Sequence, residues 1–499
     1  MALSNAAHYE SLADKLNFNT LALINGRLVP AISGKTFDTV NPATGKIITS
    51  VASCGLEDVD TAVNAARTAF ENGVWSRISP AERKARLLAF ADLIESHSEE
   101  LAVMESIDSG KPICDTLDGD LPETVSCFRF AAEAIDKIND EITPTPDSCL
   151  NLVRREPIGV CAAIRPWNFP ILMAAWKLAP ILAAGNCVVV KPAKLTSLTL
   201  LKLGELSLEA GIPAGVLNIV PGSGSVVGDA LANHMDVDLI TFTGSTSVGR
   251  NLLNCSGNSN LKRVLLELGG KNPCIVMPEI EDLDYAASEI VKAGLWNMGE
   301  NCTQNSRILI HEAIKDTLLP KILTEVEKWT VGNPLDPQNL LGALIERKHM
   351  EQILQYIEAG KQEGARLLYG GEPILQETGG NFLKPAVFDN CDQSMRIIQE
   401  EIFGPVFAIE TFHDVQEAIQ MANDTPYGLQ ASVWSDNINQ VHTLTKGIRA
   451  GVISVNHFSE GDLATPFGGY KQSGFMGRDK SVWANRQYTE LKSVYIQTQ

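Results

Sequence analysis

Residues 239–250 read LITFTGSTSVGR, an apolar, β-branched run that ends in a glycine turn and continues into a helical pattern. Similar apolar runs, separated by amphipathic helix patterns, occur at residues 187–190, 216–220 and 264–266. Strands that are apolar on both faces and alternate with helices are typical of a parallel sheet covered on both sides. A second alternation starts near residues 274–277 and continues to about residue 470. The sequence therefore predicts an α/β protein with two domains.

The composition of the 499-residue chain argues against several kinds of partner. Its 60 acidic and 41 basic side chains give a formal net charge of −19, whereas nucleic acids and anionic membranes bind clustered Lys and Arg. The most apolar region, 158–190, contains charged residues and is too interrupted for a membrane span. The ten cysteines lack CxxC spacing, and the N-terminal residues lack a secretory-signal pattern. We therefore expect a cytoplasmic protein with reduced thiols and no metal, nucleic acid or membrane partner.

Two segments with strand character lie outside the alternation. One covers residues 150–155 and follows a proline-rich stretch, and the other is the tail at 488–496. We predict that they pair with each other and add an edge to the sheet of a neighbouring subunit. The alternative is a simple edge hairpin on one domain.

Glycine turns follow two of the predicted strands and indicate a nucleotide crevice. The run 216–220 leads into PGSGSVVG, and the run 239–243 leads into GSTSVG. Such turns let the backbone approach a pyrophosphate at a helix N-terminus. The first has the spacing GxGxxxG, one residue off the usual dinucleotide fingerprint, so by itself it is also compatible with an ordinary turn. Lys191, at the end of a third strand, supports the crevice.

Cys302 is the candidate nucleophile because it lies in a polar, glycine-containing loop between a predicted helix at 283–296 and a strand at 307–310. The other cysteines lie in mainly apolar or helical patterns, which are typical of structural thiols. Glu267 ends an apolar run just before two glycines, a position that suits a general base acting on water. Asn168, held between prolines in RPWNFP, offers an amide donor for an oxyanion. Taken singly, Glu267 is equally a loop cap and Asn168 a turn residue.

Several motifs resemble those of the aldehyde dehydrogenase superfamily and occur in the same order. They are PWNFP with Lys177 downstream, VVVKPA, FTGSTSVG, LELGGK, the Cys302 loop, EEIFGPV at 400–406 and PFGGYKQSG at 466–474. The match spans about residues 20–499. The ending GGYKQSG…GRDKS…YTELKSVYI looks most similar to bacterial γ-glutamyl-γ-aminobutyraldehyde dehydrogenases.

This resemblance implies an aldehyde dehydrogenase-like α/β fold with three parts. A Rossmann-like coenzyme domain would comprise residues 1–137 and 158–269, an α/β catalytic domain residues 270–483, and a small β oligomerisation arm residues 138–157 and 484–499. The family usually forms homodimers or homotetramers. It oxidises aldehydes to carboxylic acids with NAD or NADP, so the resemblance implies an oxidoreductase with a small-molecule aldehyde as substrate.

The resemblance also implies roles for individual residues. Cys302 would attack the aldehyde to give a thiohemiacetal, whose oxyanion is held by the Asn168 amide and the Cys302 backbone N–H before hydride leaves for the nicotinamide. Glu267 would activate the water that hydrolyses the resulting thioester, with Lys177 nearby as a relay or an orienting residue. Coenzyme contacts are expected from Ile164, Trp167, Lys191, Lys194, Gly224, Gly228, Gly244, Ser245, Glu267, Gly269, Glu401 and Phe403. Substrate contacts are expected from Phe169, Met173, Trp176, Trp296, Met298, His457 and Phe458.

Two departures from the family pattern bear on specificity. After KPA the family commonly has Glu, which repels a 2′-phosphate, whereas this chain has Lys194. NAD is the expected coenzyme, and NADP stays open because a cation removes this repulsion; alternatively, Lys194 simply points to solvent. The loop also reads Met298-Gly299-Glu300-Asn301 where Gln-Gly-Gln-Cys is commoner, so the surroundings of the thiol differ from the usual pattern.

The expected substrate residues are mostly large and apolar, which fits an arylacetaldehyde such as indole-3-acetaldehyde or phenylacetaldehyde. Acidic residues near the presumed tunnel mouth instead favour an amino- or guanidino-aldehyde, and the resemblance adds γ-glutamyl-γ-aminobutyraldehyde. These residues are Asp118, Asp120, Glu123, Glu460 and Asp462. Each of them is also interpretable as a solvated surface charge, so the sequence leaves both substrate classes open.

Three other functions are alternatives. A nicotinamide dehydrogenase acting on alcohols would not need a cysteine nucleophile. A CoA-acylating dehydrogenase would transfer the acyl group to a thiol, but Glu267 argues against it because such an enzyme has no use for an activated water. A non-enzymatic binding protein would not need Cys302, Glu267 and Asn168 together.

Overall fold

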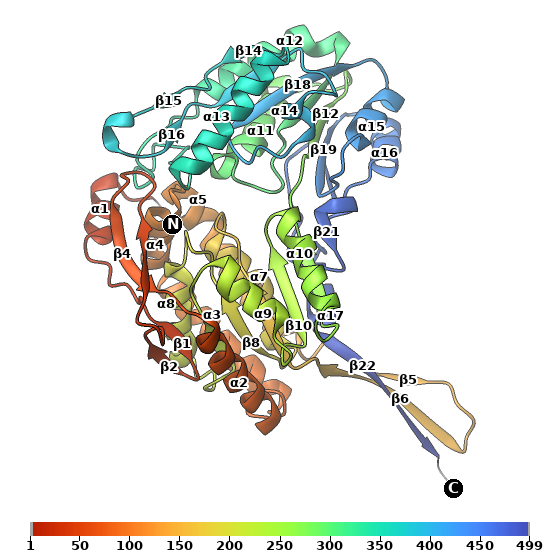
Figure 1. Cartoon of the computed structure of the whole chain (residues 1–499). Coiled ribbons are helices and arrows are strands. Elements are labelled where there is room, and N and C mark those ends of the chain that lie inside the picture. Colours follow the sequence, from red (N-terminus) through yellow and green to blue (C-terminus); the bar gives the residue numbers. More distant parts are fainter. Residues whose placement is uncertain (1–2, 498–499) are drawn as a thin grey trace.

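The computed structural model describes residues 3–497 and contains two large sheets, each in its own lobe (Figure 1). The sheet of the first lobe has eight strands in the order β2-β1-β9-β8-β7-β10-β11-β21. In that order they cover Arg27–Val29, Ala22–Ile24, Leu217–Ile219, Cys187–Lys191, Val160–Ile164, Leu239–Thr243, Arg263–Glu267 and Gly474–Phe475. The strands from β9 to β11 are parallel, whereas the outer strands are antiparallel to their neighbours. The predicted parallel sheet is confirmed.

Helices cover both faces of this sheet because its central strands are apolar on both faces. Strands β7, β8 and β10 are buried along their whole length. One helical layer consists of α2 (Leu56–Asn72), α9 (Asp229–Asn233) and α10 (Thr246–Gly257). The other consists of α7 (Pro170–Ala183) and α8 (Leu198–Glu209), backed by α3 (Pro80–Ser96), α4 (Ser98–Ser109) and α6 (Leu121–Ala134).

The second lobe is built on a seven-stranded sheet in the order β14-β17-β18-β13-β12-β19-β20. In that order the strands cover Arg366–Tyr369, Ala386–Asp389, Val406–Phe412, Arg307–His311, Pro273–Val276, Gln430–Trp434 and Val452–Val455. All are parallel except β14, which is antiparallel to β17. Its helices are α11 (Leu283–Leu295), α12 (Glu312–Glu327), α13 (Arg347–Gln362), α14 (Arg396–Gln399), α15 (Val415–Asn423) and α16 (Ile438–Gly447). The second predicted alternation is therefore a separate sheet.

Short elements connect these layers. They are α1 (Ala6–Ala13), β3 (Thr36–Val40), β4 (Ile47–Ala52), α5 (Ile113–Asp115), η1 (Thr116–Asp120), η2 (Gly224–Gly228), η3 (Trp296–Gly299), β15 (Pro373–Ile374), η4 (Gln376–Thr378), β16 (Phe382–Leu383) and η5 (Lys471–Ser473). None of the helices formed by residues 3–497 is both long enough and apolar enough to cross a bilayer.

The strand order of the first sheet reverses at β7, and this reversal positions the candidate site. Strands β8 and β9 lie on one side of β7, whereas β10 and β11 lie on the other. The connections that leave neighbouring strands in opposite directions open a crevice at the carboxyl edge, where open α/β sheets bind ligands. The side chains at this edge include Ile164, Lys191, Thr243 and Glu267, each the last residue of its strand.

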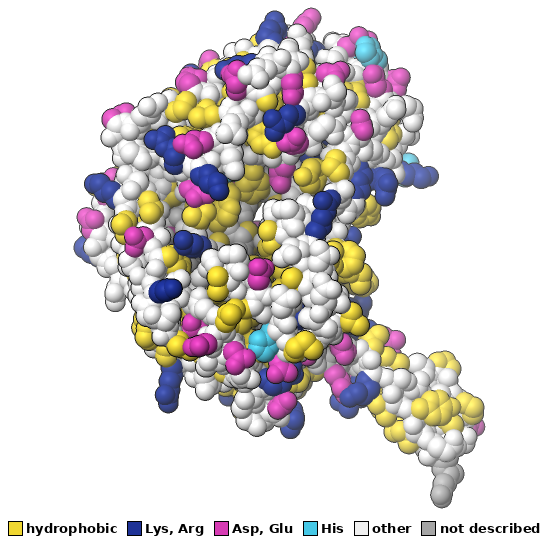
Figure 2. All heavy atoms as spheres, viewed as in Figure 1, with side chains coloured by type: hydrophobic (Ala, Val, Ile, Leu, Met, Phe, Trp, Pro, Cys, Tyr) yellow, Lys and Arg dark blue, Asp and Glu magenta, His cyan; other side chains and the backbone are white. Residues whose placement is uncertain are grey.

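The two outlying segments form an arm. Strand β22 (Thr489–Gln497) pairs antiparallel with β6 (Cys149–Pro157), which also pairs with β5 (Glu141–Thr143). The predicted pairing of these segments is confirmed. The arm projects from the first lobe (Figure 1), and hydrophobic side chains are visible on its surface (Figure 2). Ile142, Leu491 and Tyr495 are among its exposed apolar residues.

Near its end the chain returns from the second lobe to the first. Strand β21 is antiparallel to β11 and places Gly474 opposite Glu267. Helix α17 (Ser481–Gln487) then packs against α6 and α7 before the chain enters the arm. The hydrophobic pattern does not reveal this return because β21 is only two residues long. The return brings residues from the end of the chain to the predicted general base.

Helix α11 packs closely against strand β18 at Gly294. A Cβ on Gly294 would lie 1.9 Å from Cε1 of Phe407, a ring that is fully buried. We expect Gly294→Ala to destabilise the second lobe by about 1–3 kcal/mol because the ring has no space to move. The measurement is the midpoint of thermal unfolding. Gly257→Ala is the matched control, since Gly257 also lies in a helix but has open space at its Cβ position. Equal midpoints for both variants would contradict the prediction.

Candidate active site

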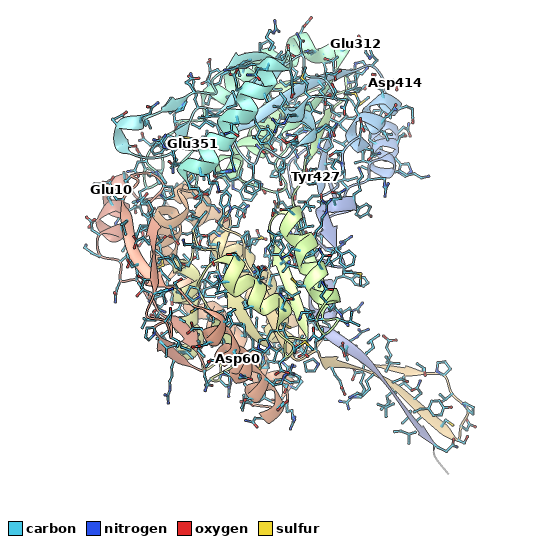
Figure 3. All side chains as sticks on the ribbon, in the orientation of Figure 1. Glu10, Asp60, Glu312, Glu351, Asp414 and Tyr427 are labelled. Atoms are coloured by element: carbon cyan, nitrogen blue, oxygen red, sulfur yellow. The ribbon has the colours of Figure 1, made fainter. Side chains whose placement is uncertain are left out.

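A cavity of about 730 Å³ lies where the two lobes meet. Every predicted coenzyme residue except Glu267 lines it, namely Ile164, Trp167, Lys191, Lys194, Gly224, Gly228, Gly244, Ser245, Gly269, Glu401 and Phe403. Cys302 and Asn168 line it as well. Figure 3 shows the side chains at this junction, where the labelled Tyr427 stands just above α10. The structure thus gathers residues of both lobes around one space.

Glycines keep one end of the cavity open. Gly224 has no atom within 4 Å of the position of a Cβ, so this turn leaves room for a ligand. Gly244 leads into Ser245, the N-cap of α10, whose hydroxyl accepts a hydrogen bond from the Val248 N–H at 3.4 Å. The free N–H groups and the dipole of a helix N-terminus attract phosphate. This end of the cavity fits the pyrophosphate of a dinucleotide.

Two charged side chains, the buried Lys191 and the half-buried Glu401, also line the cavity. Lys191 donates to the carbonyl oxygen of Pro192 at 2.8 Å, which leaves two further N–H donors on its ammonium group. Burial lowers the pKa of Lys191 to about 8. Glu401 Oε1 accepts from the Gly270 N–H at 2.9 Å, and burial raises the pKa of Glu401 to about 7. An ammonium donor and a carboxylate acceptor fit the hydroxyl groups of the two riboses.

Lys194 stands at the rim of the coenzyme end. It lines the cavity but is exposed, and its Nζ lies 5.4 Å from the centroid of the Phe37 ring. Its charge therefore faces both the cavity and the solvent.

Cys302 is positioned by an unusual backbone turn. Asn297, Met298 and Gly299 have φ values of 52°, 56° and 70°, a left-handed conformation that is uncommon for residues other than glycine. Asn272 Nδ2 donates to the carbonyl oxygen of Cys302 at 2.8 Å. The sharp turn brings the thiol to the cavity, and the amide of Asn272 fixes the backbone that carries it.

Asn168 is held beside Cys302 by amide hydrogen bonds. Its Nδ2 donates to the Glu300 carbonyl oxygen at 2.9 Å, and Asn297 Nδ2 donates to the Asn168 carbonyl oxygen at 3.0 Å. A side-chain amide has two N–H donors, so one remains for an oxygen in the cavity.

Glu267 ends β11 and is buried behind the cavity, next to a buried ion pair. Lys177 on α7 pairs with Asp479, and both side chains are almost fully inaccessible. A Cβ on Gly468 would lie 2.8 Å from Glu267 Oε1, so only glycine fits beside this carboxylate. The structure therefore brings the predicted Lys177 close to Glu267, together with Asp479, which is 302 residues away from Lys177 in the sequence.

The surroundings make both reactive groups hold their protons tightly. Burial raises the pKa of Glu267 well above its ordinary value, and Asp479 raises it further, whereas Lys177 lowers it. Burial also raises the pKa of the Cys302 thiol well above its ordinary value, and the Glu460 carboxylate is the next largest cause.

The predicted substrate residues divide into three groups. Phe169, Met173 and Trp176 line the cavity. Trp296 and Phe458 continue this wall through ring contacts, with centroids 5.1 Å apart for Phe169 and Trp296 and 6.3 Å apart for Trp296 and Phe458. Met298 instead packs into the core of the second lobe, and His457 is exposed. The left-handed turn directs Met298 away from the cavity.

The five acidic residues expected near the tunnel also differ in position. Glu460 lines the cavity, whereas Asp118 and Asp462 are exposed. Asp120 forms a buried ion pair with Lys111, and Glu123 accepts from Trp176 Nε1 at 3.1 Å. Within residues 3–497, no group of three or more His, Cys, Asp and Glu side chains is arranged to hold a metal ion.

Sequence reasoning missed several residues that complete this site. Phe467 lines the cavity and packs edge-on against Trp176, with ring centroids 5.0 Å apart. Asn272, Asn297 and Asp479 position the reactive groups described above. Phe467 and Asn297 lie inside motifs that resemble those of the aldehyde dehydrogenase superfamily, so these motifs could have indicated both residues.

Comparisons with known proteins agree with this architecture. The aldehyde dehydrogenase family profile matches residues 29–494. An aminoacetaldehyde dehydrogenase from Pseudomonas aeruginosa is 49% identical over 99% of each chain. The structure of P. syringae AldA indole-3-acetaldehyde dehydrogenase, a mutant in complex with NAD+ and IAA, is 49% identical with a TM-score of 0.98, over 99% of this chain and 100% of that one. A Burkholderia cenocepacia gamma-glutamyl-gamma-aminobutyraldehyde dehydrogenase is 48% identical with a TM-score of 0.97, again over 99% and 100%. The chain belongs to the aldehyde dehydrogenase family and is an aldehyde-oxidising enzyme.

Proposed function

We propose that this enzyme converts an aldehyde into its carboxylic acid with NAD, and that Cys302 is the nucleophile. The observation that carries the proposal is the arrangement around one cavity. The residues Cys302 and Asn168 line the same space as the glycine turns, and the buried Glu267 is close enough to act on the charge of Cys302. A thiol, an oxyanion donor and a base are the groups that acyl chemistry needs.

The coenzyme would be held by the side chains at the glycine-rich end. Lys191 and Glu401 would bind the ribose hydroxyls, Ser245 a pyrophosphate oxygen, and Phe403 would pack near the nicotinamide. When bound, the dinucleotide supplies the acceptor for the hydride. We propose NAD as the coenzyme because the glycine turns and the ribose contacts are sufficient to bind it. NADP stays open because the Lys194 cation would not repel a 2′-phosphate.

Cys302 would form the covalent bond to the substrate. Its sulfur attacks the carbonyl carbon after losing its proton, and the carbonyl oxygen becomes the oxyanion of a thiohemiacetal. The free N–H of Asn168 and the backbone N–H of Cys302 would bind this oxyanion, and each such donor is worth about 100- to 1000-fold in rate. The hydrogen bonds from Asn297 and to Glu300 keep the Asn168 amide in place.

Glu267 would complete the reaction by taking a proton from water, which then attacks the thioester and releases the acid. Burial raises the pKa of Glu267, so it is a stronger base than a carboxylate in water. Lys177 and Asp479 lie next to it and would carry the proton onward. Because water is the acyl acceptor in this arrangement, hydrolysis is favoured over transfer to CoA.

The substrate would be an arylacetaldehyde or an aminoaldehyde. The aromatic wall formed by Phe169, Trp176 and Phe467 supports the first class. The Glu460 carboxylate in the same cavity supports the second. The relatives act, by name, on indole-3-acetaldehyde, aminoacetaldehyde and γ-glutamyl-γ-aminobutyraldehyde, which include both classes.

We also propose that residues 1–137 and 158–269 bind the coenzyme, residues 270–483 carry the catalytic loop, and residues 138–157 and 484–499 join subunits. The projecting arm with exposed Leu491 and Tyr495 supports a homodimer or homotetramer. A bacterial cytoplasm is the proposed location, because all ten cysteines are free and the three relatives described are bacterial.

Replacing Cys302 by Ala tests the proposal directly. We expect acid formation to fall by about 10⁴-fold or more, since without the sulfur no covalent intermediate forms. The measurement is NADH formation together with identification of the acid product. Cys391→Ala, a half-buried cysteine of the second lobe, is the control and should keep its activity. A folded Cys302→Ala enzyme with undiminished turnover would rule out the mechanism.

The pH dependence of the hydrolytic step tests the role of Glu267. A base acts when deprotonated, so hydrolysis rises as the pH passes upward through the raised pKa of Glu267. Asp479→Asn removes a negative charge and leaves Lys177 unpaired, and both changes favour ionised Glu267. We therefore expect the increase in hydrolysis rate to occur at a pH lower by about one unit than in wild type. Turnover of p-nitrophenyl acetate, which acylates the thiol without coenzyme, reports this step.

Lys177→Met provides the opposite change in this experiment. It removes the cation that lowers the pKa of Glu267, so the increase in hydrolysis rate should occur at higher pH than in wild type. Shifts in the same direction for both variants would exclude the proposed electrostatic coupling.

Lys194→Glu tests the choice between coenzymes. A carboxylate at the rim repels a 2′-phosphate, so we expect kcat/KM for NADP to fall by about tenfold or more relative to that for NAD. Lys446→Glu, an exposed residue of α16, makes the same change of charge far from the cavity and serves as the control. An unchanged NADP-to-NAD ratio in Lys194→Glu would show that Lys194 faces solvent only.

A further inference from the structure

Glu460 is an acidic side chain of the cavity that the proposed mechanism does not use. It lines the cavity together with Phe169, Trp176 and Phe467, the aromatic end. The other carboxylates that line the cavity are Asp229, which follows Gly228 in the glycine turn, and Glu401, which lies beside Gly269. The charge of Glu460 therefore acts on the part of the cavity that the chain of the aldehyde would occupy.

Glu460 is fixed directly beside the nucleophile. Thr303 Oγ1 lies within hydrogen-bond distance of Glu460 Oε1 and, at 2.9 Å, of Asn301 Oδ1. The Thr303 N–H already donates to Asn301 Oδ1 at 3.0 Å, which leaves the hydroxyl proton for Glu460. Since Thr303 follows Cys302 in the chain, the carboxylate is anchored one residue from the sulfur. Burial raises the pKa of Glu460, and a bound cation would favour its ionised form. A carboxylate held in a partly dehydrated cavity interacts strongly with such a cation.

Charged groups from several elements face Glu460. Lys111 and Lys480 are the cations, and Asp120 and Glu123 are the other carboxylates. Lys111 is paired with Asp120, and Lys480 Nζ donates to two main-chain carbonyl oxygens at 3.0 and 2.5 Å. Three carboxylates against two ammonium groups leave one net negative charge when all are ionised. Burial raises the pKa of all three carboxyls, that of Glu123 to about 7, so this charge develops as the pH rises through their pKa values.

The aromatic walls already have a cation of the protein beside them. Lys480 Nζ lies 5.0 Å from the centroid of the Trp176 ring and 5.7 Å from that of the Phe467 ring. Aromatic ring faces attract positive charge through their quadrupole. Because Lys480 already lies beside these rings, the attraction for an ammonium group of the substrate would come from Glu460, which lines the cavity with them.

We infer that Glu460 is a specificity-determining residue that binds a positively charged group on the substrate, so that the enzyme selects short aldehydes with a primary ammonium group over neutral aldehydes. This inference rests on the proposed role of Cys302 and narrows the two substrate classes to one.

The same contact links substrate charge to the nucleophile. Glu460 is the charged group that most raises the pKa of the Cys302 thiol, ahead of Glu401 and Glu267. An ammonium group bound at Glu460 offsets that negative charge, so the thiol loses its proton more readily. A cationic aldehyde thereby promotes its own attack by sulfur, whereas a neutral aldehyde does not.

The test compares 3-aminopropanal with butanal, its neutral isostere, in the full-length enzyme with NAD. We expect wild type to have the higher kcat/KM for 3-aminopropanal, and Glu460→Gln to lower the ratio of the two values by about tenfold or more. Because both aldehydes use the same sulfur, the ratio cancels any general effect on the nucleophile. Asp462→Asn, an exposed acid of the same loop, is the matched control and should change the ratio by less than about twofold.

Two further measurements separate binding from a structural role. Alkylation of Cys302 by iodoacetamide should show an apparent pKa lower by about one unit in Glu460→Gln. In wild type, propylammonium should inhibit butanal oxidation at about tenfold lower concentration than 1-propanol, a result that needs no folded variant.

The possible results separate a failure of the proposed role of Glu460 from a failure of the proposed function. A ratio that is unchanged in Glu460→Gln, or equal inhibition by propylammonium and 1-propanol, would overturn the role of Glu460 while leaving the proposed function intact. If wild type oxidises neither aldehyde, or Cys302→Ala oxidises both, the proposed function fails and this inference fails with it.

Discussion

The buried ion pair between Lys177 and Asp479 is the interaction on which the site depends. Lys177 comes from α7 of the first lobe, and Asp479 from the segment that returns from the second. Backbone hydrogen bonds of 2.8 and 2.7 Å join Asp479 to Phe467, so the pair also fixes a wall of the cavity. Removing one partner of a buried pair leaves an uncompensated charge, which is strongly destabilising. The pair therefore ties the base, the cavity wall and the interface between the lobes into one unit.

A second constraint is electrostatic. Burial, and then the nearby carboxylates of Glu460, Glu401 and Glu267, raise the pKa of the Cys302 thiol and so oppose formation of the thiolate. Such an arrangement suits an enzyme whose nucleophile is inactive at rest and becomes reactive when positive charge arrives. It also protects the sulfur from chance electrophiles, since the thiolate is the reactive form. The acidic residues labelled at the periphery of both lobes, such as Glu10 and Asp414 (Figure 3), play no part in this balance because water screens them.

Local patterns predicted much of the fold but little of the side-chain geometry. The strand predicted at 239–243 matches β10, and the two outlying segments pair as expected, because hydrophobic alternation reports directly on burial. Glu267 ends its strand, as the run before it indicated. Asp479 could not be found this way, since its importance comes from a contact across 302 residues and a two-residue strand. The direction of Met298 depends on a left-handed φ that no hydrophobic pattern encodes.

The position of Cys302 follows from amides rather than from the residues next to it. Asn272 binds its carbonyl oxygen, and Asn297 binds the backbone of both Asn168 and Glu300. These bonds hold backbone atoms, which are the same whatever side chains the loop carries. The unusual Met298 is accommodated because its side chain fills the core of the second lobe. The loop can therefore depart from the common family sequence and still present the sulfur to the same space.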